Sequence, residues 1–487
     1  MTDRHGAAQP GAVETHTADE VPERARHGGV RALFTLGFAT HIAPLALVTG
    51  AMAVQVCHQP LWSGVLAVLV GQLLGGVCTA SRWAPGPQPG GPRGLRSRAR
   101  FGSPGALPSV AVAAAVYIAL FAAHLVLAGR SLHALAPHLP VGAGILLAAV
   151  GSALLCLIGG RLLHFLHKTA AVALGLGSLA GLAVVVARGL PADFLTRGGF
   201  TFAGWLAIVA LSALWQPALA PYVADPARSL PRPARTAAAF RATYGGSCLG
   251  SLLPFLAGAV VAPACPGPDP VAGFDTAAGA FGPVLLALFL LILLPHGAFN
   301  LYRAVQTTLT FGPQLRARSV RGVVGVLVLA CGPALALALA GDFVPRFADL
   351  ALVLLAVLVP WAAINVVDAV LLRHSGQDPE EAGAPDDDHH GRFDPVALGS
   401  YALGLAVQIP FLTAGPYTGP MAAYFGGVNL SWCVGLTVTT PLYFLWARSR
   451  RRCDGAAVFS VREQAARILD PLRPLYPEDV RGFADTR

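Results

Sequence analysis

Long apolar runs constrain this chain more than any other feature of its sequence. Such runs, roughly 18 to 25 residues each, have the length of a helix that crosses the hydrocarbon core of a bilayer. The runs therefore predict an all-α polytopic membrane protein with twelve transmembrane helices. They are 32–56, 61–80, 107–128, 141–158, 169–187, 200–223, 240–262, 281–302, 323–340, 350–372, 395–413 and 430–446.

Composition and charge agree with a bilayer location. Of the 487 residues, 55% are hydrophobic and 12% are charged, and an average soluble domain carries about twice that charge. The net charge of +9 does not indicate nucleic-acid binding, because the basic residues lie between the hydrophobic runs rather than in one patch. Membrane lipids with anionic headgroups are the partners that this distribution favours.

The arginines and lysines predict the orientation of the chain. Seventeen basic residues fall in the loops that follow even-numbered spans, whereas the opposite loops hold only Arg130, Arg188, Arg197 and Arg346. Loops rich in basic residues stay on the cytoplasmic side of a membrane. We therefore expect a multi-pass protein of the cell membrane with both termini in the cytoplasm.

Two of the predicted spans carry helix breakers near their middle. In the sixth, Pro217 and Pro221 follow Trp215, and in the first, His41 and Pro44 lie near mid-membrane. Proline removes a helix hydrogen bond and clashes with the preceding turn. Broken helices at corresponding positions of two halves indicate a transporter built from inverted repeats, with its binding site at the bilayer midplane. A proline-kinked packing helix is the alternative for the sixth span.

These features divide the chain into a transporter domain and two tails. Residues 1–28 are polar and of mixed charge, which is typical of a disordered tail, here a cytoplasmic one. The transporter domain covers 29–446, and residues 447–487 are the expected C-terminal cytoplasmic tail. Within the domain we expect repeat one at about 29–190, repeat two at about 200–373 and two appended helices at about 395–446.

Five strings, in order along the chain, carry a family resemblance. They are GPQPGGPRGLRSRARFGSPGALP in an inner loop, YVADPARSLP after span six, FNLYRAVQTTLTFG closing span eight, PWAAINVVDAVLLR in span ten and IPFLTAGPYTGPMAAYFGGVNLSWCVGL near the end. With these strings the chain resembles the nucleobase–cation symporter-1 family, and within it the purine–cytosine permease branch. The resemblance runs from about residue 30 to 446.

The resemblance implies a leucine-transporter-type fold, a 5+5 inverted repeat plus two helices. It implies a secondary active transporter that imports a nucleobase (purine or cytosine) or a related heterocycle, coupled to sodium or protons. In that fold, spans 1, 3, 6 and 8 line the substrate site. The family sandwiches a planar base between aromatic rings and reads its polar edge with amides.

Four residues on these spans are the first candidates for substrate binding. Every nucleobase has a π-face that stacks on aromatic rings and an edge that forms paired hydrogen bonds. Trp215 is the expected stacking partner and Gln216 the expected amide, with Tyr117 and Asn300 as further candidates. Packing roles for the two aromatic residues, and capping or helix–helix bonding for Asn300, remain open.

Histidines stand at several site positions where the branch carries other residues. His41 takes the place of an asparagine in span one, Leu120 and His124 replace an aromatic residue and an asparagine in span three, and His296 replaces a glycine in span eight. We expect His41 and His124 to contact the substrate. The departures leave open a specialised substrate or a member impaired in transport.

The eighth span also bears on the coupling ion. In sodium-coupled relatives, hydroxyl side chains on this helix help to hold the ion, but the stretch LLALFLLILLPHGAFN contains no serine or threonine. Histidine titrates near neutral pH and suits a proton relay. We therefore expect coupling to protons rather than sodium, with His296 or His41 as the carrier. Hydrogen bonding of these rings between helices or to the base is the alternative.

The remaining polar motifs define a gate and exclude other functions. Asp225 and Arg228, within YVADPARSLP, are the expected inner gate, with solvated surface charges as the alternative. The sequence contains no metal motif, cofactor motif, nucleophile elbow or paired intramembrane carboxylates, so we expect no metal, no cofactor and no enzyme activity. The competing function is a non-transporting membrane scaffold or sensor that retains the permease fold.

Overall fold

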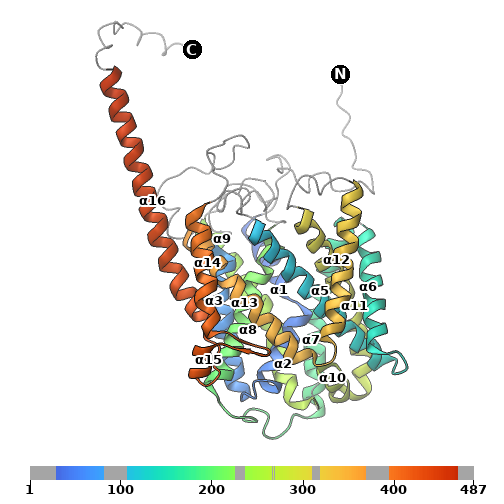
Figure 1. Cartoon of the computed structure of the whole chain (residues 1–487). Coiled ribbons are helices and arrows are strands. Elements are labelled where there is room, and N and C mark those ends of the chain that lie inside the picture. Colours follow the sequence, from blue (N-terminus) through green and yellow to red (C-terminus); the bar gives the residue numbers. More distant parts are fainter. Residues whose placement is uncertain are drawn as a thin grey trace, which may run out of the picture.

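The computed structural model is a helical bundle (Figure 1). It describes residues 29–81, 107–158, 160–224, 236–265, 267, 269–309, 318–368 and 394–469. The long helices are α1 (Val30–His41), α2 (Pro44–Gln55), α3 (Leu61–Ser81), α5 (Leu107–Leu135), α6 (Val141–Leu157), α7 (Gly160–Arg188), α8 (Phe202–Ala224), α9 (Thr236–Val261), α11 (Gly282–Thr308), α12 (Arg318–Leu339), α13 (Phe343–Val367), α14 (Pro395–Gln408) and α16 (Ser431–Leu469).

Short elements connect the long helices at one end of the bundle. The helices α10 (Pro270–Ala278) and α15 (Pro420–Tyr424) lie there, opposite the end from which α16 projects (Figure 1). We call this the α10 end. The other short elements are three 3-10 turns, Ala262–Ala264, Gly279–Phe281 and Ile409–Phe411, and an antiparallel hairpin of β1 (Thr413–Ala414) and β2 (Tyr417–Thr418).

Each of the twelve predicted spans coincides with helical structure, although fewer helices qualify as spans by themselves. In the described part of the chain, eight helices are long and apolar enough to cross a membrane, and the bent pair α1–α2 would make nine. Val141–Leu157 and Pro395–Phe411 are shorter apolar helices. The chain is therefore a multi-pass membrane protein, while the count of twelve crossings stays a prediction.

The helices pack as two groups. In the first, α3 packs on α8, and α1 and α2 pack on α9; in the second, α5 packs on α11 and α12, and α6 packs on α11. Helix α7 contacts α9 and α11, and α13 contacts α8, α14 and α16. The first five spans are α1–α2, α3, α5, α6 and α7, and the next five are α8, α9, α11, α12 and α13. When each helix is replaced by its counterpart in the other half, the α3–α8 contact becomes α9–α1 and the α6–α11 contact becomes α12–α5. An inverted repeat would produce this pattern, and the repeat itself stays a prediction.

The first span is broken where the sequence predicted a break. Helix α1 ends at His41, α2 begins at Pro44, and the two axes are bent by 60°. Pro44 is suited to the first turn of α2, where its missing N–H removes no helix bond. Non-helical backbone at membrane depth must lie inside the protein. Ile42 and Ala43, which form the break, are accordingly buried.

The expected break in the sixth span is wrong. Helix α8 is continuous from Phe202 to Ala224 and runs through Pro217 and Pro221. A proline inside a helix removes one backbone hydrogen bond and strains the preceding turn. In a membrane, neighbouring helices can compensate for this loss through their side chains.

Two side chains of helix α3 bond to the backbone of α8 beside Pro217. Gln72 Nε2 donates to the carbonyl oxygen of Ser212 at 2.9 Å, and Thr79 Oγ1 donates to the carbonyl oxygen of Gln216 at 2.8 Å. Both bonds are buried. They anchor the turn before Pro217 to α3, and α8 stays helical through the proline.

Glycines allow the broken first span to lie directly against α9. A Cβ atom at Gly258 would lie 1.9 Å from the carbonyl oxygen of Leu47, and one at Gly50 would lie 2.0 Å from the carbonyl oxygen of Phe255. Real Cβ atoms do not approach other atoms this closely. Small residues at helix interfaces in membranes bring two backbones into contact, and here they hold α2 in place after the break.

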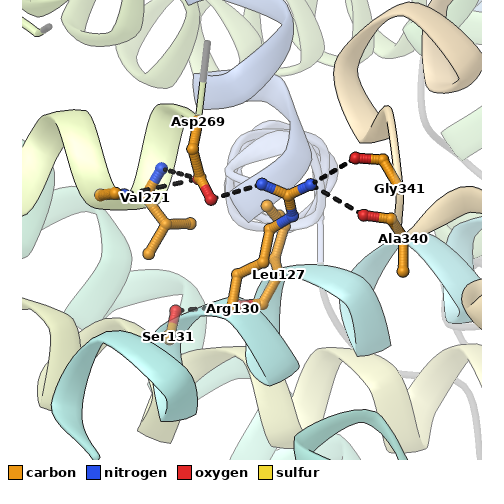
Figure 2. Close-up of polar contacts among 8 residues, drawn as sticks. Leu127, Arg130, Ser131, Asp269, Val271, Ala340 and Gly341 are labelled. Atoms are coloured by element: carbon orange, nitrogen blue, oxygen red, sulfur yellow. Dashed lines mark hydrogen bonds and ion pairs between the residues drawn. The ribbon is translucent and has the colours of Figure 1, made fainter. Parts of the chain in front are cut away.

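One guanidinium joins three segments at the α10 end (Figure 2). Arg130 of α5 pairs through Nη1 with Oδ2 of Asp269, the N-cap residue of α10. Asp269 Oδ1 accepts the backbone N–H of Val271 at 2.9 Å, and Arg130 Nη2 donates to the carbonyl oxygen of Ala340 at 2.9 Å. The arrangement ties α10 to α5 and to the segment after α12.

We expect Arg130→Gln to lower the melting temperature in detergent, with a loss of roughly 1–3 kcal/mol, because it leaves Asp269 and a carbonyl without their donor. The two side chains are 13% and 33% exposed, so solvent reduces the cost below that of a fully buried charge. Arg346→Gln is the control, since its pair with Asp342 is 51% and 77% exposed and should contribute less than about 1 kcal/mol. Equal shifts for the two variants would contradict the prediction.

Candidate functional site

Three histidines from three helices meet in the interior of the protein. The rings of His124 on α5 and His296 on α11 are nearly parallel, with centroids 6.0 Å apart and an interplanar angle of 11°. The ring of His167 on α7 lies 4.5 Å from that of His296 at an angle of 50°. All three are buried. The structure thus brings together two predicted site residues, His124 and His296, and adds a third histidine.

His167 was not among the predicted site residues because the predicted span boundaries place it in an inner loop. The sequence predicted the fifth span at 169–187, but α7 begins at Gly160. The available signal was helical spacing, since Leu163, His167, Ala170 and Leu174 recur at intervals of three and four residues. All four are buried, so His167 belongs to the inward face of the helix.

Hydrogen bonds determine which ring nitrogen is available in three of the histidines. Nδ1 of His41, His124 and His296 lies 2.8, 2.6 and 2.9 Å from the carbonyl oxygen four residues earlier. A carbonyl oxygen only accepts, so we assign the hydrogen to Nδ1 in each ring. Nε2 is then an acceptor in the neutral ring, and it is buried with no donor to it among the described residues. An unpaired buried acceptor is costly, so each ring offers a place for an N–H donor or a proton.

Apolar side chains separate His296 from a crevice at the α10 end. Ile42, in the break of the first span, packs with Leu174 of α7 and with Ile292, one turn before His296 on α11. Leu174 and Ile292 also line the crevice, which lies between α2, α7, α9, α10 and α11 and has an empty volume of about 820 Å³ including its open side. Its lining includes Ser178, whose hydroxyl is buried with no partner in the described segments.

Trp215 and Gln216 make their contacts within the first helix group. The Trp215 indole donates from Nε1 to Thr49 Oγ1 at 3.2 Å and meets the ring of Phe255 edge-on, with centroids 6.2 Å apart. Gln216 Nε2 donates to Gln72 Oε1 at 2.7 Å. These contacts agree with the packing interpretation of Trp215. Its role in stacking, and that of Gln216 as an edge-reading amide, stay predictions.

Tyr117 and Asn300 lie on the same two helices as the stacked pair of histidines. Tyr117 is 1% exposed and precedes the histidine of α5 by two turns. Asn300 Nδ2 donates to the carbonyl oxygen of His296 at 2.8 Å. This bond lies within α11, so it is neither the capping nor the helix–helix bond that was the alternative for Asn300. Contact of either residue with a substrate remains untested.

Several predicted features lie outside the described residues. The gate pair Asp225 and Arg228 is among them, and so are the N-terminal tail 1–28 and the last residues, 470–487. The predicted start of the C-terminal tail at 447 falls inside α16, which continues as a helix to Leu469. The helical part of this tail therefore follows the last predicted span without a break.

Comparison with known proteins gives the site a family context. A family model described as "Permease for cytosine/purines, uracil, thiamine, allantoin" matches residues 20–435. The chain is also similar to a Bacillus subtilis (strain 168) protein named "Putative purine-cytosine permease YxlA". The two are 30% identical over 450 residues, which cover 90% of this chain and 96% of YxlA.

Solved structures are similar to this fold over most of its length. One is Mhp1, a nucleobase-cation-symport-1 family transporter, in a closed conformation with bromovinylhydantoin bound; the TM-score is 0.68 at 17% identity, covering 90% of this chain and 95% of Mhp1. The inward-facing conformation of Mhp1 matches with a TM-score of 0.69 at 17% identity, covering 91% and 96%. At this identity the likeness concerns the fold.

Proposed function

Because the chain belongs to the family of permeases for cytosine and purines, uracil, thiamine and allantoin, we propose that it imports a nucleobase (purine or cytosine) or a related heterocycle. Import proceeds by alternating access and is coupled to a cation, with a proton favoured over sodium. One observation carries the proposal. His41, His124 and His296 are buried imidazoles, at the break of the first span and on α5 and α11, whose Nε2 acceptors lack a partner within the described chain.

Imidazole acceptors suit the polar edge of a nitrogen heterocycle. A nucleobase presents N–H donors along its edge, and a donor from the substrate would satisfy a buried Nε2 that otherwise costs free energy. His124 supplies one such acceptor, and His296 supplies a second while its Nε2 is unprotonated, from helices that pack against each other. Bromovinylhydantoin, which is bound in Mhp1, adds hydantoins to the substrates worth testing.

A proton suits α11 better than a sodium ion does. In broken-helix transporters, backbone carbonyls at the break coordinate the cation, and sodium requires further oxygen ligands. Between residues 285 and 300 of α11 there is no serine or threonine, and the polar side chains are His296 and Asn300. Ionisable groups inside a membrane mark ion and proton pathways. Histidine is the side chain that takes up and releases a proton near neutral pH, so His296 or His41 is the proposed carrier.

Uptake in a strain that lacks its own base permeases tests the proposal. We expect concentrative uptake of one class of base that rises in an inward proton gradient, collapses with a protonophore and is unchanged when choline replaces sodium. A thermal-shift screen of purines, pyrimidines and hydantoins identifies the ligand, since a molecule that binds only the native state raises the melting temperature. Binding without uptake would favour the scaffold or sensor, and sodium-dependent uptake would exclude proton coupling.

Trp215→Ala is expected to weaken substrate binding by about 1–3 kcal/mol, the range for stacking of a base on an aromatic ring. Trp215→Phe should restore part of the loss. Titration of the purified protein with the ligand from the screen measures the affinity. Trp205→Ala is the control on the same helix, because Trp205 stacks on Phe202 with centroids 6.3 Å apart. If Trp215→Ala lowers the melting temperature and leaves affinity unchanged, the residue only packs.

Site-directed labelling tests the proposed location in the cell membrane with cytoplasmic termini. In a background without the natural cysteines, Arg450→Cys should react with an impermeant reagent only after the membrane is opened. Arg346→Cys should react in intact cells, because the positive-inside rule places the start of α13 outside. Both side chains are 51% exposed, so accessibility within the protein is matched. The opposite labelling pattern would reverse the topology.

A further inference from the structure

His167 is a buried titratable group that the proposed transport cycle leaves unused. It is 8% exposed, about two helical turns from Gly160, where α7 begins. That end of α7 lies opposite the α10 end and is the side that the positive-inside rule assigns to the cytoplasm. The residue that follows, Lys168, is exposed. His167 therefore stands between the interior of the bundle and its cytoplasmic face.

The side chains next to His296 differ between the two ends of the bundle, and only one end provides a group that can accept a proton. Toward the α10 end, Ile42, Leu174 and Ile292 form an apolar seal. Toward the other end, the ring of His167 lies 4.5 Å from that of His296, near enough for transfer between ring nitrogens directly or through one water. The His167 ring is held by stacking on Phe299, with centroids 4.3 Å apart.

We propose that His167 is the inner station of the proton pathway, which receives the proton from His296 and releases it to cytoplasmic water at the start of α7. This inference rests on the proposed proton-coupled import. In the step, the seal of Ile42, Leu174 and Ile292 parts in the outward-open state of the alternating-access cycle, and Nε2 of His296 binds a proton from the outer side. Its Nδ1–H stays bonded to the carbonyl of Ile292. The imidazolium passes that proton to the unprotonated ring nitrogen of His167. His167 then gives a proton to water, and both rings return to neutral.

Other titratable and charged groups surround the pair of His167 and His296, and the test leaves them unchanged. His124 of α5 stacks on His296, His41 ends α1, which packs on α7, and the guanidinium of Arg303 on α11 lies 4.9 Å from the centroid of the Phe299 ring. Cys156 of α6 donates to the carbonyl of Ala298 on α11. From α9, apolar Leu253 meets α7 beside Gly175. In the described segments no group of three or more His, Cys, Asp or Glu residues could hold a metal ion.

His167→Gln in the full-length protein, reconstituted in liposomes with the base identified by uptake, tests the inference. Exchange of internal for external base at equal pH needs no net proton release, so it should stay within about twofold of the wild type. Accumulation driven by an inward proton gradient should fall about 100-fold, the lower end of the effect of losing a positioned proton-transfer group. A trapped pH dye should show the same loss of substrate-dependent acidification. His133→Gln is the matched control, because His133 is exposed at the α10 end and should change neither readout.

The possible outcomes separate the inferred role of His167 from the proposed proton-coupled import on which it rests. If His167→Gln accumulates base as the wild type does, His167 is no proton station, although proton-coupled import stands. If exchange and accumulation fall together, His167→Asn repeats the measurement, and loss of exchange in both variants means that the residue is structural. A wild-type protein that does not exchange base, or that accumulates it without a proton gradient, removes the proposed function itself.

Discussion

His296→Gln is expected to reduce proton-driven accumulation of substrate about 100-fold, because glutamine forms hydrogen bonds but cannot carry a proton. The residue is 3% exposed, and its ring lies next to both His124 and His167. The glutamine amide is also shaped differently from the imidazole ring, so a substrate hydrogen bond to Nε2 is misplaced and exchange of base should fall as well. This second effect distinguishes His296→Gln from His167→Gln, which should keep exchange.

Transport in proteoliposomes, with and without an inward proton gradient, measures the effect. His138→Gln is the control, because that histidine is exposed in the connection between α5 and α6. The melting temperature of each variant in detergent shows whether it folds. Uptake that depends on sodium and survives both His296→Gln and His41→Asn would rule out the histidines as carriers of the coupling ion.

Gly258→Ala is expected to lower stability by more than about 3 kcal/mol, at the upper end of the cost of overpacking. The new methyl group would lie 1.9 Å from the carbonyl oxygen of Leu47. Backbone cannot yield as a flexible side chain does, so α2 and α9 must separate. The shift would also displace Thr49, which accepts the indole hydrogen bond of Trp215, and transport should be lost with stability.

Gly325→Ala provides the matched control, because a Cβ atom at Gly325 of α12 meets nothing within 4 Å. Alanine is also a better helix former than glycine by about 1 kcal/mol, so this variant should be as stable as the wild type or slightly more so. Thermal unfolding in detergent and the yield of monodisperse protein measure both variants. A Gly258→Ala protein with an unchanged melting temperature would show that α2 and α9 do not pack this closely.

The sequence alone determined the features that depend on neighbouring residues or on summed composition. The apolar runs predicted the spans because a helix in lipid must satisfy its own backbone and cover it with apolar side chains over a set length. The break in the first span was also local, since Pro44 favours a helix start and α2 begins there. The ordered strings identified the family, which the match over residues 20–435 confirms. Placement of histidines on spans one, three and eight was visible in the same way.

Tertiary structure decided how side chains far apart in the sequence satisfy one another. Pro217 predicted a broken span, but α8 stays helical through it. Gln72 and Thr79, 140 and 137 positions from their acceptors, anchor the adjoining turn to α3. His167 became part of the cluster only when α7 packed on α11 and brought its ring within 4.5 Å of His296. Hydropathy and proline are one-dimensional signals, whereas a hydrogen-bond partner or a ring neighbour depends on the packing of helices in three dimensions. For that reason the spans could be predicted from the sequence, and the contacts of the candidate site required the fold.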